Sequence, residues 1–131
     1  MRILLGVIAG AVAAFLCVIA VEYAAHMVYP PPPGFDFHDS EQLARAMAAA
    51  PTGAFAIVAA GWFVAALIGA WVADAVAKRA VAGWIVTLIL VAACIANLLM
   101  IPGHPPWMWA AGILLPLIGG WLAQRLAGVT A

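Results

Sequence analysis

The chain has very few charged residues for its length. Of its 131 residues only 8% are charged, five basic and five acidic, and the formal net charge is zero. An ordinary globular domain carries roughly 25% charged residues, so these side chains could not cover the surface of a water-soluble fold. A nucleic-acid-binding domain needs a basic patch, and a disordered chain needs low hydrophobicity. The composition therefore excludes a soluble enzyme, a nucleic-acid-binding protein and a disordered chain.

Residues that carry chemistry are also scarce. The two cysteines, Cys17 and Cys94, lie inside apolar stretches and show neither a C-x-x-C pattern nor metal-type spacing. We interpret them as small buried apolar side chains rather than as a disulfide or a redox pair. Ser40 is the only serine, and the chain has no glycine-rich phosphate loop. No nucleophile–base pair is therefore visible, and no enzyme class is indicated.

Apolar residues dominate what is present. They make up 69% of the chain, against roughly 45–50% in a globular protein. A helix needs about 20 apolar residues to cross the hydrocarbon core of a membrane. Stretches of this kind run over about 3–28, 52–75, 80–101 and 106–127. We predict a single all-α domain over 1–131, an integral membrane four-helix bundle embedded in a lipid bilayer.

The first stretch also resembles a secretory signal peptide, since Arg2 precedes an apolar run. That run extends from Ile3 to Val21, which is longer than the usual apolar region of about 7–15 residues in a signal peptide. We expect it to be retained as a membrane-spanning helix.

The basic residues predict the orientation in the membrane. Arg2, the pair at 78–79 and Arg125 fall on one side of a four-span topology, and only Arg45 falls on the other. Lysine and arginine are enriched in cytoplasmic loops. We therefore expect both termini to be cytoplasmic and the long loop over 29–51 to face outward.

The outward loop contains two recognisable local signals. Pro30–Pro33 is a stiff stretch without backbone donors. Asp39 followed by Gln42 resembles a capping box at a helix N-terminus. We predict a proline-rich extracytoplasmic loop with a short amphipathic helix over about 40–49.

Small residues predict close contacts between helices. Gly6 and Gly10 form a G-x-x-x-G pattern, which lets helix backbones approach each other in membranes. We expect this face to pack inside the monomer, and a homo-oligomer formed through the same face is the alternative. Asp74 and Lys78 are four residues apart at a helix end, and we expect them to form an ion pair.

Ionisable residues inside a membrane span are functional candidates. Glu22 lies about 9 Å below the outer end of the first span, and His26 lies one turn further along the same helical face. Asn97 lies near the outer end of the third span, and the loop that contains His104 closes over the same level. We therefore predict a binding site in the outer leaflet, formed by Glu22, Tyr23, His26, Trp62, Asn97 and His104.

Trp62 is included because it lies about 15 Å into its span. A buried indole N–H needs a hydrogen-bond partner. The ring either packs against another helix or faces a bound ligand.

A carboxylate and an imidazole one helical turn apart are compatible with several functions. They can form a structural hydrogen bond, or together with His104 they can bind a divalent metal such as zinc. They can also handle a proton or a solute. E-x-x-x-H alone is a weak motif, since it lacks the second histidine of an H-E-x-x-H site. We expect a binding or accessory role, with a small oligomeric transporter or proton-coupled carrier and a metal-dependent membrane enzyme as alternatives.

Two stretches, EYAAHMVYPPP over 22–32 and NLLMIPGHPPW over 97–107, resemble a group of small, uncharacterised bacterial four-span membrane proteins. The resemblance implies a location in the bacterial inner membrane and implies no activity or catalytic residue. In size and helix number the chain is also similar to the small multidrug resistance transporters, which use a glutamate in the first helix. Glu22 lies too near the outer end for that role, and the long acidic loop departs from their compact pattern.

Overall fold

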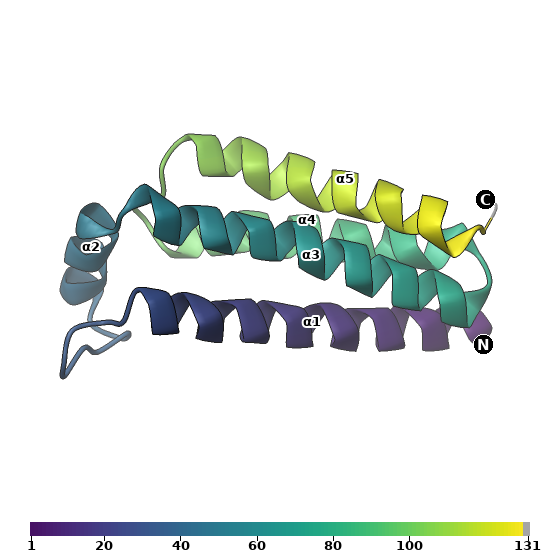
Figure 1. Ribbon diagram of the computed structural model, residues 1–131, viewed down its shortest axis with the longest axis horizontal. Helices are drawn as coiled ribbons and strands as arrows, with labels where there is room; N and C mark the ends of the chain where they lie inside the picture. The colour runs from purple at the N-terminus through teal and green to yellow at the C-terminus, as the bar shows by residue number, and fades with distance from the viewer. Residues whose placement is uncertain (130–131) are drawn as a thin grey trace.

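The protein is all-helical in the computed structural model, which describes residues 1–129 (Figure 1). No strand occurs in this part of the chain. The helices are α1 (Arg2–Val28), α2 (Ser40–Ala49), α3 (Thr52–Ala77), α4 (Ala80–Met100) and α5 (Trp107–Ala127).

The four long helices, α1, α3, α4 and α5, are long and apolar enough to cross a membrane. Their ends agree with the predicted stretches to within two residues, and the largest difference is that α3 ends at Ala77 rather than at residue 75. Lys78 ends α3 with a left-handed backbone conformation, at φ 58°. The short α2 occupies the position predicted for it in the long loop.

The central helix of the arrangement is α3. It packs against α1, α4 and α5, whereas α1 and α5 make no contact with each other. In Figure 1, α1 and α5 lie on opposite sides of α3, and α4 lies behind it. Because α1 contacts α4 much less than it contacts α3, the α1–α4 side is the loosely packed side of the molecule.

The glycines of α1 allow the close contact with α3. Gly6 and Gly10 are both buried, and a Cβ atom built on Gly6 would lie 2.6 Å from the carbonyl oxygen of Ala73. The G-x-x-x-G face is therefore used inside the monomer. A homo-oligomer through the same face would require α1 to leave α3.

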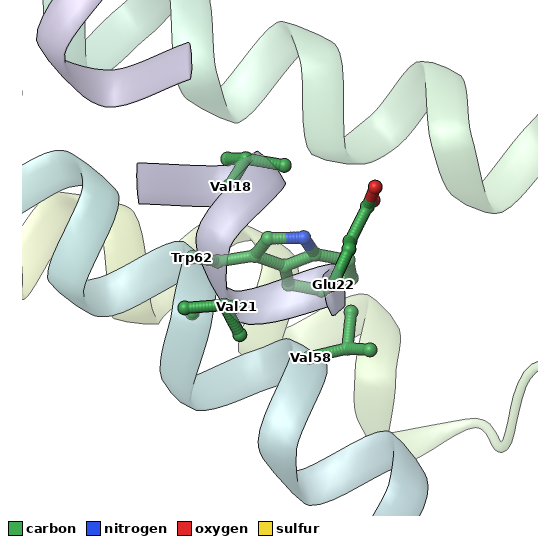
Figure 2. Close-up of a pocket in the computed structure, with 6 residues that line it drawn as sticks. Val18, Val21, Glu22, Val58 and Trp62 are labelled. Atoms are coloured by element: carbon green, nitrogen blue, oxygen red, sulfur yellow. The ribbon is translucent and has the colours of Figure 1, made fainter. Parts of the chain in front are cut away.

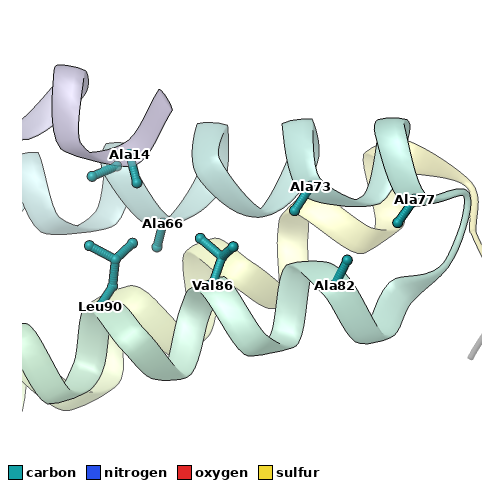
Figure 3. Close-up of a cluster of buried hydrophobic side chains, with 8 residues drawn as sticks. Ala14, Ala66, Ala73, Ala77, Ala82, Val86 and Leu90 are labelled. Atoms are coloured by element: carbon teal, nitrogen blue, oxygen red, sulfur yellow. The ribbon is translucent and has the colours of Figure 1, made fainter. Parts of the chain in front are cut away.

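A cluster of small buried side chains fills the space between these helices (Figure 3). Small residues dominate because a bilayer provides little hydrophobic driving force between helices, so that close van der Waals packing provides the stability. The cluster comprises Ala14, Ala65, Ala66, Ala73, Ala77, Ala82, Val86 and Leu90.

Asp74 connects the end of α3 to the start of α4. Its side chain is completely buried, and its Oδ1 accepts a hydrogen bond of 2.7 Å from the backbone N–H of Gly83. The other carboxyl oxygen, Oδ2, has no hydrogen-bond partner among residues 1–129. The predicted ion pair with Lys78 is wrong, because the left-handed turn at Lys78 ends the helix and leaves that residue exposed.

Two further hydrogen bonds hold the same end of the molecule together. Thr87 donates from its hydroxyl to the carbonyl oxygen of Gly83 at 2.9 Å. Gln124 of α5 donates to the carbonyl oxygen of Ala80 at 3.3 Å. This end of the structure is closed by hydrogen bonds and small side chains.

At the other end, Asp39 caps α2. Its carboxylate accepts hydrogen bonds from the backbone N–H groups of Glu41 and Gln42, and the Gln42 amide also donates to it at 2.9 Å. These donors, with the Gln42 backbone N–H first, hold the pKa of the Asp39 carboxyl below its usual value. In a standard capping box the residue at the position of Gln42 accepts from the capping residue, whereas here Gln42 accepts from the backbone N–H of Asp36.

Candidate functional site

A cavity of about 440 Å³ lies at the end of the molecule that carries α2. The last turns of α1 and α4, the first turns of α3, and α2 form its walls together with the two loops at this end. Its polar side chains include four residues of the predicted site, Glu22, His26, Asn97 and His104. The structure therefore places these four side chains on the wall of one cavity.

A second cavity, of about 310 Å³, lies between α1 and α4, with Trp62 of α3 contributing to its wall. Its other walls are almost entirely apolar, and it shares Glu22 and Asn97 with the first cavity. Phe15 and Ile89 line it and are 65% and 49% exposed on the outer surface of the helices. We name the two spaces the loop cavity and the groove cavity. Glu22 and Asn97 mark the place where they adjoin.

Glu22 lies on an apolar surface and has no partner in the described part of the chain. Figure 2 shows its side chain projecting from α1 past the ring of Trp62, above Val58. The hollow between these side chains measures about 10 Å³, which is at the lower limit for one water molecule. Within residues 1–129 the carboxylate makes no hydrogen bond and no ion pair. It is a free acceptor at the junction of two cavities.

Trp62 provides a free donor beside Glu22. Its side chain is only 6% exposed and packs with Cys94 and Leu98 of α4. Its indole N–H donates to no atom of the described residues, although the ring lines the groove cavity. The indole N–H is not among the buried side-chain atoms that lack a partner, so it is accessible from the cavity and can donate to a ligand atom.

The histidines differ in how they are held. The Nδ1 atom of His104 lies 2.7 Å from the carbonyl oxygen of Ile101. Only a protonated Nδ1 can donate to a carbonyl, so in the neutral ring Nε2 is left as an acceptor. The ring of His26 packs against Phe37, with 5.9 Å between the ring centres. The structural hydrogen bond between Glu22 and His26, one of the possibilities that the sequence left open, does not form in residues 1–129.

The arrangement does not form a metal centre. Glu22, His26 and His104 line one cavity, but no group of three His, Cys, Asp or Glu residues over 1–129 is placed so that it could hold a metal ion. His104 uses one ring nitrogen for the loop carbonyl, and the His26 ring packs at a tilted angle against Phe37. The geometry thus gives the zinc interpretation no support.

Tyr23 lies outside both cavities. It follows Glu22 by one residue, which turns it about 100° around the helix, and it is 69% exposed. In the loop, Asp36 and His38 contact each other at 3.3 Å and also lie outside the cavities.

Several wall residues were not predicted from the sequence. Phe37 of the loop, Met47 of α2 and Phe55 of α3 form much of the apolar wall of the loop cavity. An aromatic residue in an otherwise polar, proline-rich loop is a signal that could have identified Phe37. The groove cavity has no comparable signal, since its residues resemble the rest of the helices.

The site therefore consists of a carboxylate, an amide and an indole N–H where a wide loop cavity adjoins an apolar groove. Such a site can bind a molecule that has both a polar and an apolar part. Comparison of the chain with known protein families, with curated proteins and with solved structures finds no match.

Proposed function

We propose that the protein is a four-helix integral protein of a bacterial inner membrane, with both termini in the cytoplasm. The four long apolar helices support a membrane location. The concentration of Lys and Arg at Arg2, at 78–79 and at Arg125 supports the orientation. In this orientation α2 and the loop cavity lie at the outer face.

Its function in this proposal is to bind a ligand at the outer-leaflet site. The observation that carries the proposal is that Glu22 and Asn97 line both cavities while Glu22 has no partner in residues 1–129. The cavity volumes of about 440 and 310 Å³ fall in the range of about 300–1,000 Å³ typical of ligand sites. An unpaired acid in a membrane span is costly and is typical of a functional residue.

The transporter alternative receives less support from the geometry. A carrier needs a route to both sides of the membrane, and the half of the molecule opposite the loop cavity is packed with buried alanines. Asp74 is sealed there by α4. The enzyme alternative has no three-ligand metal site in residues 1–129 to support it.

Native mass spectrometry of protein released gently from membranes tests the binding function. We expect the wild-type protein to carry one small-molecule adduct per chain, and we expect Glu22→Leu/Asn97→Leu to lose it. The double variant should still fold, because neither side chain makes a hydrogen bond in the described structure, and its melting temperature provides that check. Tyr23→Phe is the matched control, since Tyr23 neighbours Glu22 but lies outside both cavities. A wild-type protein without an adduct, or an adduct equally retained in the double variant, would refute the proposed function.

A further inference from the structure

We infer that the ligand is a membrane lipid whose headgroup carries a primary ammonium group, with one hydrocarbon chain in the groove cavity and the headgroup in the loop cavity. This inference rests on the proposed binding function and names the class of ligand.

The groove cavity indicates that the ligand carries a hydrocarbon chain. Its wall is apolar except at Glu22, Asn97 and Trp62. Its rim includes Phe15 and Ile89, which are exposed on the surface that faces the bilayer in the proposed topology. A chain can therefore enter sideways from the membrane, and the second chain of a lipid can remain in the bilayer.

The charge at the junction indicates the headgroup. Glu22 is the only Asp or Glu on either cavity wall, and no Lys or Arg lines either cavity. A carboxylate without a cation in the protein is best satisfied by a cation in the ligand, because charge-assisted hydrogen bonds are the stronger ones. A primary ammonium group provides three such donors, as lysine does. A quaternary ammonium group provides none, and an anionic headgroup would be repelled.

Two donors without acceptors, on Trp62 and Asn97, can bind the part of a lipid that links the headgroup to the hydrocarbon chains. The mostly buried ring of Trp62 lines the groove cavity, and its indole N–H has no acceptor among residues 1–129. The Asn97 amide lines the same place and can also donate. Between the hydrocarbon chain and the headgroup, an acyl lipid carries ester carbonyl oxygens, which accept such bonds. A free amine that carries only a hydrocarbon chain has no acceptor for them.

Competition between defined lipids tests the headgroup. Delipidated full-length protein would be mixed with equimolar phosphatidylethanolamine, phosphatidylcholine and phosphatidylglycerol of identical chains, and bound lipid would be counted by native mass spectrometry. We expect the wild type to prefer phosphatidylethanolamine by about tenfold or more, the ratio that a charge-assisted hydrogen bond provides. Glu22→Gln should lose this preference, and Tyr23→Phe should keep it.

Two alanines of α4 test the groove. Ala93 lines the groove cavity, whereas Ala96 is equally an exposed alanine of α4 but lines neither cavity. We expect Ala93→Phe to reduce lipid retention severalfold and Ala96→Phe to leave it unchanged.

The outcomes separate the inference from the proposed function. An adduct in protein from membranes that shows no preference among the three headgroups would overturn the ammonium assignment and leave the binding function standing. Decylamine is a primary amine that carries a single hydrocarbon chain and no ester groups. If the protein binds decylamine but not phosphatidylethanolamine, the lipid assignment is overturned and a simple amine is identified as the ligand. Equal retention in Ala93→Phe and Ala96→Phe would overturn the placement of the chain.

Discussion

Replacing Gly10 by isoleucine is expected to disrupt the packing of α1 on α3. A Cβ atom at Gly10 would meet the backbone carbonyl oxygen of Gly69 and would lie 2.7 Å from the Cβ atom of Ala73. Neither neighbour can rotate away, because one is backbone and the other is the first side-chain atom. Overpacking of a well-packed interface typically costs about 1–3 kcal/mol and occasionally more. We expect Gly10→Ile to lower the free energy of unfolding by about 3 kcal/mol or more.

The control for this variant is Ala20→Ile, which adds a bulky side chain to an exposed position of the same helix. Isoleucine is a better helix former than glycine, so propensity alone would stabilise Gly10→Ile. Thermal unfolding in one detergent should show a large decrease in melting temperature for Gly10→Ile and little change for Ala20→Ile. Equal melting temperatures for the two variants would show that α1 does not pack on α3 through this glycine.

Replacing Asp74 by leucine is expected to be the second most damaging single change. Asp74 accepts from the Gly83 N–H across the helix junction at 2.7 Å, and the site is completely buried. Leucine has no acceptor, so that backbone N–H would be left unsatisfied, at a cost of about 1–3 kcal/mol. A Cβ built on Gly83 would lie 2.5 Å from Asp74 Oδ2, so the site also has little room for a branched side chain.

Asp74→Asn separates the hydrogen bond from the charge. Asparagine keeps the oxygen that accepts from Gly83, removes the charge, and replaces the unpartnered Oδ2 by a neutral NH2 group. We therefore expect Asp74→Asn to unfold in denaturant close to the wild type and Asp74→Leu to unfold much earlier. If Asp74→Asn were as unstable as Asp74→Leu, the charge of Asp74 rather than its hydrogen bond to α4 would be the stabilising element.

The helices could be predicted from the sequence because each depends on local information. Uninterrupted apolar stretches define the four long helices to within two residues. The capping residues Asp39 and Gln42 locate the start of α2. The G-x-x-x-G face was also predictable, although which helix it contacts was not. Which helix the glycine face contacts depends on how all the helices pack together.

The sequence could place some of the residues that line the cavities, but not the exclusion of Tyr23 from both of them and not the hydrogen bonds. Helical periodicity places Glu22 and His26 on one face, and both do line the loop cavity. Periodicity does not determine side-chain rotamers, and so it could not decide whether Glu22 and His26 form the hydrogen bond that was one of the alternatives; the structure has none in residues 1–129. The Asp74–Lys78 pairing failed for a similar reason, since the helix ends at Lys78 and a tertiary donor, Gly83, is available to Asp74.

The groove cavity was not predictable from the sequence. Its residues on α1 and α4 are as apolar as the neighbouring ones. The cavity lies between these two helices, which contact each other less than each contacts α3. Trp62 was identified by its depth and its need for a partner. Its position beside Glu22 depends on the packing of α1 against α3.

Glu22 is an open carboxyl group without a partner in residues 1–129, whereas Asp74 is a sealed, structural one. Labelling of the intact protein in its membrane with a hydrophobic carbodiimide, followed by peptide mapping, tests this contrast most directly. The structure predicts modification at Glu22, which adjoins a cavity with an exposed rim, and protection at Asp74, whose side chain is 0% exposed. Modification of Asp74 at a rate equal to or above that of Glu22 would show that Asp74 is not sealed and that Glu22 is not the accessible carboxyl group.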